Sequence, residues 1–162
     1  MEIKLVLFLP RDASSVPVIR QVLDGCLDVL GVATDTRTDI ALALGEACAN
    51  VIQHAGPGEE YEVTARVTGS RCIIEVVNTG SGTDPVTGGA AAGGPGAAEP
   101  PAADDAAEDP ATAEHGRGVK IMTAVVDEFQ LTSAREGTTV HLEKDLRWEP
   151  GSAGEQLSHS EG

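Results

Sequence analysis

Hydrophobic residues recur along this chain with two different spacings, which together predict five strands and three helices. Apolar runs, or runs that alternate apolar and polar residues, predict strands at residues 3–9, 61–67, 72–77, 129–134 and 138–143. Helical spacing fills three longer segments, residues 14–30, 35–55 and 116–126. The run at 72–77 is more apolar than its neighbours, so we expect that strand to lie near the centre of the sheet.

The order of these elements predicts the fold class. Short turns at residues 69–70 and 135–137 join consecutive strands, so we expect those strand pairs to be antiparallel. The helices and the sheet bury their apolar surfaces together when all the helices lie on one side. We therefore expect an α+β fold, a two-layer sandwich in which a mixed β-sheet carries about three helices on one face.

A change in composition separates the ordered core from a long insertion. Residues 83–114 are rich in Ala, Gly and Pro, and they include acidic residues but no Lys or Arg. Such a segment cannot bury enough apolar surface to offset its ordering entropy, so we expect a flexible lid within a domain that spans residues 1–144. Residues 145–162 are polar and contain several Gly and Ser, and we expect them to form a disordered tail.

The chain of 162 residues is acidic, with 11 basic and 26 acidic residues and a formal net charge of −15. This charge argues against direct binding of DNA or RNA and suits a basic protein partner. The sequence has no apolar run long enough for a transmembrane helix and no secretory signal, so we expect a cytoplasmic protein without membrane contact. Cys26, Cys48 and Cys72 lie in apolar patterns without the spacing of a zinc site, so we expect reduced, buried thiols.

The most informative motif is the stretch from Glu46 to His54, which contains a carboxylate, an amide and an imidazole at intervals of four residues. On a helix, Glu46, Asn50 and His54 form one stripe beside the apolar face. A carboxylate and an amide one turn apart can share a hydrated Mg²⁺, or one can hold the metal while the other orients a nucleophile. The stripe is equally consistent with a helix that merely has a polar edge.

Two glycine motifs add candidate ligand contacts. Asn78-Thr-Gly80-Ser-Gly82 follows the central strand, where glycine allows a ligand to approach the backbone closely. Gly116-Arg117-Gly118 precedes the third helix, whose free N–H groups suit phosphates, and Arg117 and Lys120 add positive charge. Each motif alone is a weak signal, because ordinary turns and helix starts often contain glycine.

The ordered set of motifs resembles the GHKL, or Bergerat, ATP-binding fold. Glu46-x-x-x-Asn50 resembles the N box of that group, the Asn78–Gly82 turn its G1 box, Gly116-Arg117-Gly118 its G2 box, and Gly137-Thr138 its last box. The resemblance covers nearly the whole chain, from about Ile3 to Leu142. Within the group the chain is most similar to the small, stand-alone anti-sigma factor serine kinases, so we expect neither a phosphoacceptor helical pair before the domain nor a transducer domain after it.

The resemblance implies roles for individual residues. Glu46 would be the catalytic base toward a serine hydroxyl, and Asn50 would bind the Mg²⁺ that bridges the phosphates of ATP. The other implied ATP contacts are Asn78, Gly80, Gly82, Gly116, Arg117, Gly118, Lys120 and Thr138. Asn78 departs from the family, which has Asp at this position to accept a hydrogen bond from the adenine amine. An amide oxygen can accept the same bond, but more weakly.

The resemblance also implies the partners. We expect an ATP-dependent protein-serine kinase that is also an anti-sigma factor, binds a sigma factor, and phosphorylates a STAS-domain anti-anti-sigma protein. Members of this family often form homodimers. A catalytically silent module that keeps the fold and the partner surface without turnover remains open, because Asn78 replaces the usual acid. A kinase in a phosphorylation switch unrelated to sigma factors is the third alternative.

Overall fold

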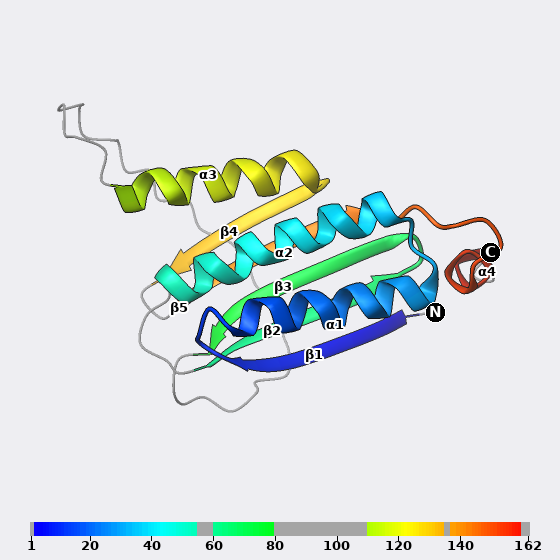
Figure 1. Cartoon of the computed structure of the whole chain (residues 1–162), viewed down its shortest axis with the longest axis horizontal. Helices are drawn as coiled ribbons and strands as arrows, with labels where there is room; N and C mark the ends of the chain where they lie inside the picture. Colours follow the sequence, from blue (N-terminus) through cyan, green and yellow to red (C-terminus); the bar gives the residue numbers. More distant parts are fainter. Residues whose placement is uncertain (1, 55–59, 80–109, 135–136, 160–162) are drawn as a thin grey trace, which may run out of the picture.

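The computed structural model describes residues 2–54, 60–79, 110–134 and 137–159 of the chain (Figure 1). Within these ranges it has five strands and four helices. In chain order they are β1 (Glu2–Pro10), α1 (Ser15–Leu30), α2 (Thr34–His54), β2 (Glu60–Thr68), β3 (Arg71–Thr79), α3 (Pro110–Val125), β4 (Glu128–Ala134), β5 (Gly137–Asp145) and α4 (Ala153–His159). None of the helices in the described ranges combines the length and the apolarity that a membrane span requires.

The molecule has two layers, a five-stranded sheet and a layer of helices that covers one of its faces (Figure 1). The strands lie in the order β1-β2-β3-β5-β4, so β3 is central, as its apolar run predicts. In the helix layer α2 lies between α1 and α3, and it also packs against β3 and β5. The α+β fold with two layers and three helices on one face is therefore confirmed.

The sheet differs from the expected one in its strand directions. Every pairing among the described strands is antiparallel, so the expectation of a mixed sheet is wrong. The connections explain the difference. Two helices lie between β1 and β2, and one helix and one strand lie between β3 and β5. In each case the chain crosses the domain an even number of times, so the next strand starts at the end where the previous one stopped.

The core fills the space between the sheet and the helices. Central strand β3 contributes the alternate residues Cys72, Ile74 and Val76, while β2 contributes Tyr61 and Val63. Helix α2 supplies the largest helical share of the core, namely Ile40, Ala43, Leu44, Ala47, Cys48 and Val51. These positions follow helical spacing, so burial of one face of α2 fixes the direction in which its remaining side chains point.

One cysteine is not where its apolar neighbourhood suggests. Cys48 and Cys72 are buried, whereas Cys26 on α1 is exposed, so the expectation of a buried thiol is wrong at that position. Helix α1 packs on α2 and β1, and its buried apolar residues form the narrow stripe Ile19, Leu23 and Leu27. Position 26 lies one residue away from this stripe, about 100° around the helix, and therefore points outward.

The C-terminal segment contains helix α4 over Ala153–His159, where the polar sequence predicts a disordered tail over residues 145–162. Trp148 forms an isolated bridge with Val32, and α4 packs next to it. A Cβ atom on Gly154 would lie only 2.0 Å from the indole ring of Trp148, so glycine is required for this contact. Aromatic burial on the end of the core therefore holds a segment whose composition is otherwise polar.

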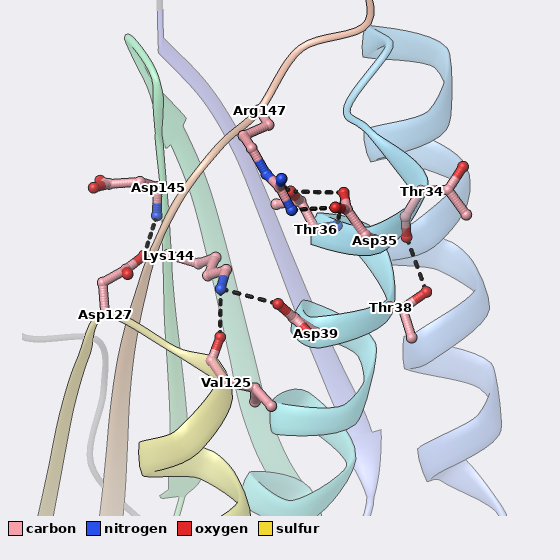
Figure 2. A network of polar contacts seen from close by, with 10 residues as sticks. All are labelled: Thr34, Asp35, Thr36, Thr38, Asp39, Val125, Asp127, Lys144, Asp145 and Arg147. Carbon is pink, nitrogen blue, oxygen red and sulfur yellow. Dashed lines mark hydrogen bonds and ion pairs between the residues drawn. The ribbon is translucent and has the colours of Figure 1, made fainter.

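A polar network joins the N-terminal end of α2 to the C-terminal ends of β5 and α3 (Figure 2). The Lys144 ammonium donates to the Asp39 carboxylate at 3.0 Å and to the main-chain carbonyl of Val125 at 2.6 Å. Because Val125 is the last residue of α3, the lysine satisfies a carbonyl that the helix itself leaves free. Arg147 forms an ion pair with Asp35. We call these five residues the anchored end of α2.

Candidate functional site

The candidate residues lie at the opposite end of α2. There the C-terminal half of α2, the end of β3, the start of β5 and the start of α3 come together, on the side of the molecule away from the two termini (Figure 1). The carboxylate and amide of the helical stripe, Glu46 and Asn50, are one turn apart on α2. We call this region the site end.

A cavity of about 190 Å³ lies between α2 and α3 at the site end. It is lined by Glu46, Ala49, Asn50, Gln53, Arg117, Gly118 and Ile121. At roughly 30 Å³ per water molecule, it can hold several waters or the oxygens of a phosphate group. The structure thus brings Glu46 and Asn50 together with Arg117 and Gly118, which lie far from them in the sequence.

Gly118 allows α3 to approach the carboxylate of Glu46. The glycine is buried, and a Cβ atom at its position would lie 2.8 Å from Glu46 Oε2 and 3.9 Å from Asn50 Oδ1. The first distance is too short for an ordinary contact, so alanine at position 118 would have to displace the end of the Glu46 side chain. Sequence spacing did not predict this contact between the two motifs.

The glycine-rich motif is not at a helix N-terminus, which corrects one prediction. Helix α3 begins at Pro110, so Gly116-Arg117-Gly118 lies roughly two turns inside it and its N–H groups belong to the helical hydrogen-bond pattern. Proline at a first helical position and the short Ala-containing run after it favour this earlier start. Arg117, which is exposed, still lines the cavity, whereas the exposed Gly116 and Lys120 are not among its lining residues.

Three side-chain amide atoms at the site end are buried without a partner. Asn50 is 5% exposed and Asn78 is 6% exposed. Among the described residues, Nδ2 of Asn50 and both Nδ2 and Oδ1 of Asn78 have no hydrogen-bond partner. Buried polar groups of folded proteins are nearly always hydrogen-bonded, so each exception needs an explanation, such as a ligand that supplies the missing partner.

Asn78 and Thr138 are brought to the same place by the sheet. Val77 on β3 pairs with Thr139 on β5, so Asn78 and Thr138 follow one residue further along the two adjacent strands. Thr138 is buried, and the preceding Gly137 has a φ angle of +154°, which disfavours other residues. A Cβ atom at Gly137 would lie 3.3 Å from the main-chain oxygen of Asn78, so glycine also relieves crowding there.

Sequence reasoning missed three residues of the cavity, Ala49, Gln53 and Ile121, and named others that lie outside the described residues. Gln53 lines the cavity three residues after Asn50, and helical spacing from Asn50 was the signal that could have identified it. Gly80, Gly82 and most of the lid predicted at residues 83–114 lie outside the described residues, as does the side chain of His54. The last residues of that lid segment, from Pro110 onward, form the start of α3 instead.

The buried groups next to the site are neutral. Burial raises the pKa of the Cys48 thiol on α2 to about 12, and it raises the pKa of Tyr61 to about 12 as well. The Tyr61 hydroxyl is 2.6 Å from the Ser15 hydroxyl, so this polar atom in the core has a hydrogen-bond partner. At neutral pH Cys48 is therefore a thiol rather than a nucleophilic thiolate.

The polar side chains of the site suit a metal ion that is held mainly by water and by the phosphates of a bound substrate. Within the described ranges, no group of three His, Cys, Asp or Glu side chains could hold a metal ion alone. Mg²⁺ is usually bound by one or two protein oxygens and completes its shell with water and substrate phosphates. A single buried amide, that of Asn50 beside the cavity, matches such a Mg²⁺ site. It does not match a site built entirely from protein carboxylates.

Comparisons with known proteins identify the family of the chain. A family model described as a histidine kinase-like ATPase domain matches residues 9–144. The serine-protein kinase RsbW of Bacillus pumilus is 30% identical over 144 residues, which cover 87% of this chain and 85% of that kinase. RsbW of Bacillus mycoides is 34% identical over 61 residues, and this match spans 38% of each protein.

A solved structure supports the fold independently of sequence identity. The RsbU and RsbW domains of Rv1364c from Mycobacterium tuberculosis superpose with a TM-score of 0.62 at 18% identity. The superposition covers 89% of this chain and 32% of that longer chain. At this level of identity the likeness concerns the path of the backbone and not the chemistry of the site.

Proposed function

Because this chain belongs to the histidine kinase-like ATPase family, with RsbW serine-protein kinases among its relatives, we propose that it is an ATP-dependent protein-serine kinase. The observation that carries this proposal is the set of buried amide atoms without partners on Asn50 and Asn78, at the end of the domain that also contains Glu46. The phosphate oxygens of a nucleotide can accept a hydrogen bond from Nδ2 of Asn50, the base can pair with the amide of Asn78, and Glu46 is one helical turn from Asn50.

In this proposal each residue has a separate task. Asn50 holds Mg²⁺, and Arg117 adds positive charge next to the phosphates. Bound Mg²⁺-ATP supplies the phosphoryl group and neutralises part of its charge. Glu46 orients a serine hydroxyl of the protein substrate and accepts its proton. Asn78 and Thr138 contact the base, and Gly80, Gly82, Gly116, Gly118 and Lys120 complete the nucleotide site.

The proposed partners come from the family. We propose that the protein substrate is a STAS-domain anti-anti-sigma protein and that the kinase also binds a sigma factor, as a monomer or as a homodimer. A net charge of −15 is compatible with holding a basic, DNA-binding protein. A silent binding module is the second candidate, and the observation that favours it is the neutral Asn78 at a position where the family has Asp.

Calorimetric titration with ATP in the presence of Mg²⁺ tests the proposal. We expect binding by the wild type, and we expect Asn50→Ala to abolish the Mg²⁺-dependent part of it. The matched control is Gln130→Ala, which removes an exposed amide on β4 and should bind like the wild type. Failure of the wild type to bind ATP would leave the silent module. Transfer of labelled phosphate to serine of a STAS-domain protein then tests the kinase activity itself.

A further inference from the structure

Asn78 has the hydrogen-bonding groups to read more than one kind of purine. It lies near the end of central strand β3, is 6% exposed, and neither its Oδ1 nor its Nδ2 has a partner among the described residues. No hydrogen bond from the described residues therefore fixes the orientation of the Asn78 amide, and Oδ1 and Nδ2 can exchange positions. Rotation of the amide by 180° exchanges the donor and the acceptor without breaking a hydrogen bond.

An amide differs from a carboxylate in the base edges that it can match. A carboxylate only accepts hydrogen bonds, so it pairs with the 6-amino group of adenine and repels the 6-oxo group of hypoxanthine or guanine. An amide offers both a donor and an acceptor. One orientation accepts from the adenine amine and donates to N1, and the other donates to a 6-oxo group and accepts from the protonated N1.

The two neighbours of Asn78 on strand β5 do not favour one orientation. The residue beside the amide is Gly137, where even an added Cβ atom would remain 3.7 Å from Asn78 Nδ2, so no side chain from that position competes for the amide. Thr138, on the adjacent strand, carries a hydroxyl that can donate or accept a hydrogen bond. The Asn78 amide and the Thr138 hydroxyl can therefore each form a hydrogen bond with either a 6-amino or a 6-oxo purine.

Resting on the nucleotide site proposed above, we propose that Asn78 lets this protein bind 6-oxopurine nucleotides as well as ATP. The replacement of an acidic residue by Asn is then a change of nucleotide specificity and not a loss of nucleotide binding.

Inosine triphosphate is the decisive probe, because it differs from ATP only at the 6-position and the adjacent N1 proton. By calorimetry with Mg²⁺, we expect the wild type to bind the two nucleotides with dissociation constants within about tenfold of each other. Binding of ATP with rejection of inosine triphosphate by more than about 100-fold would overturn the inference and leave the proposed function intact. Binding of neither nucleotide would overturn both.

Substitution sharpens the test. Asn78→Asp should keep ATP binding and raise the preference for ATP over inosine triphosphate at least about tenfold, since a carboxylate cannot donate to the 6-oxo group. The matched control is Gln130→Glu, which makes the same amide-to-acid change at an exposed position on β4 and should leave the preference unchanged. If Asn78→Asp does not fold, Asn78→Ala should weaken both nucleotides by the same factor. An unchanged preference in Asn78→Asp would contradict the inference, as would an Asn78→Ala variant that weakens only ATP.

Discussion

Both ends of α2 lie beside buried or half-buried polar groups, but only one end pairs them within the described part of the fold. At the anchored end, Lys144 reaches both Asp39 and a helix-terminal carbonyl, and Arg147 pairs with Asp35 (Figure 2). At the site end, the amides of Asn50 and Asn78 are more deeply buried, yet three of their polar atoms have no partner among the described residues. The polar groups of the anchored end find partners within the fold, whereas the amides of the site end have polar atoms that the nucleotide proposed above would pair.

The two ends differ in energy because a buried polar group without a partner loses its hydrogen bonds to water and gains none in the protein. An unmade hydrogen bond in a protein interior costs about 1–3 kcal/mol, whereas a made one stabilises by about 1 kcal/mol. Asp35 and Asn50 are separated by roughly four turns of helix, or about 22 Å, so changes at one end should not alter the other. Substitutions at the anchored end should therefore change stability, and those at the site end should change ligand binding or catalysis.

The largest expected effect is on catalysis at the site end. Glu46→Gln keeps the shape of the side chain but removes its ability to accept a proton. We expect nucleotide binding to persist and phosphotransfer to fall by about 100-fold or more, the usual scale of a general base. Glu46 is partly exposed, so the free energy of unfolding should stay within about 0.5 kcal/mol of the wild type.

Single-turnover transfer of labelled phosphate to the protein substrate measures this change, and chemical denaturation measures stability. A Glu46→Gln variant that transfers phosphate at the wild-type rate would show that Glu46 is not the base.

The second effect breaks the anchored end. Lys144→Met keeps the length of the side chain but leaves the Val125 carbonyl and the Asp39 carboxylate without their ammonium partner. We expect the free energy of unfolding to fall by about 2 kcal/mol, because these groups are only partly accessible to water. Nucleotide binding by the folded protein should not change.

The control is Lys4→Met, which removes an exposed lysine on edge strand β1 and should leave stability nearly unchanged. Equal losses in the two variants would mean that net charge, and not the network, is responsible.

Most of the fold could be predicted from the sequence because its signals are local. The alternation in β2 and the apolar run of β3 identify strands, and the stripe of apolar residues in α2 identifies its buried face. Strand direction was predicted less well, since it depends on how many elements each connection contains. Helix α4 could not be predicted from its polar composition, because the contact between Gly154 and Trp148 that accompanies it is tertiary.

The proximity of the candidate site residues could be predicted only in part, for the same reason. Glu46 and Asn50 are neighbours on one helix, so their spacing alone brings them together. The contact of Gly118 with Glu46 depends on the packing of α3 against α2, and no local pattern predicts it. The start of α3 was also misplaced, since the glycine motif looked like a helix start while helix-forming residues extended the helix to Pro110.

The third substitution should raise the free energy of unfolding, whereas Lys144→Met should lower it. Asn78→Leu replaces a buried amide without partners by an apolar side chain of similar size. We expect the free energy of unfolding of the ligand-free protein to rise by about 1 kcal/mol, because the cost of the unmade hydrogen bonds disappears. ATP binding should be lost, as is common when stability is gained at a functional site.

Denaturation without nucleotide and titration with nucleotide measure the two halves of this prediction. A large destabilisation would mean that the amide has a structural partner, and the contrast between the two ends of α2 would then fail.

The smallest expected effect is a pH dependence at the anchored end. The main-chain N–H of Thr36 holds the pKa of the Asp35 carboxyl below its ordinary value of 3.8, and the nearby Arg147 guanidinium acts in the same direction. A lowered pKa in the folded state means that the unfolded state binds more protons in acid. The stability from Asp35 is therefore complete above about pH 4 and is lost as the pH falls through the folded-state pKa.

Comparison of the wild type with Asp35→Asn isolates this contribution. The variant keeps an oxygen that can accept from Thr36 but loses the charge that pairs with Arg147, so the wild type should be slightly more stable at pH 7. The difference should shrink at about pH 2, and also in about 1 M salt at pH 7, which screens an exposed pair. A difference that is the same in acid, in salt and at neutral pH would show that the ion pair with Arg147 contributes nothing and that Lys144 alone holds the anchored end.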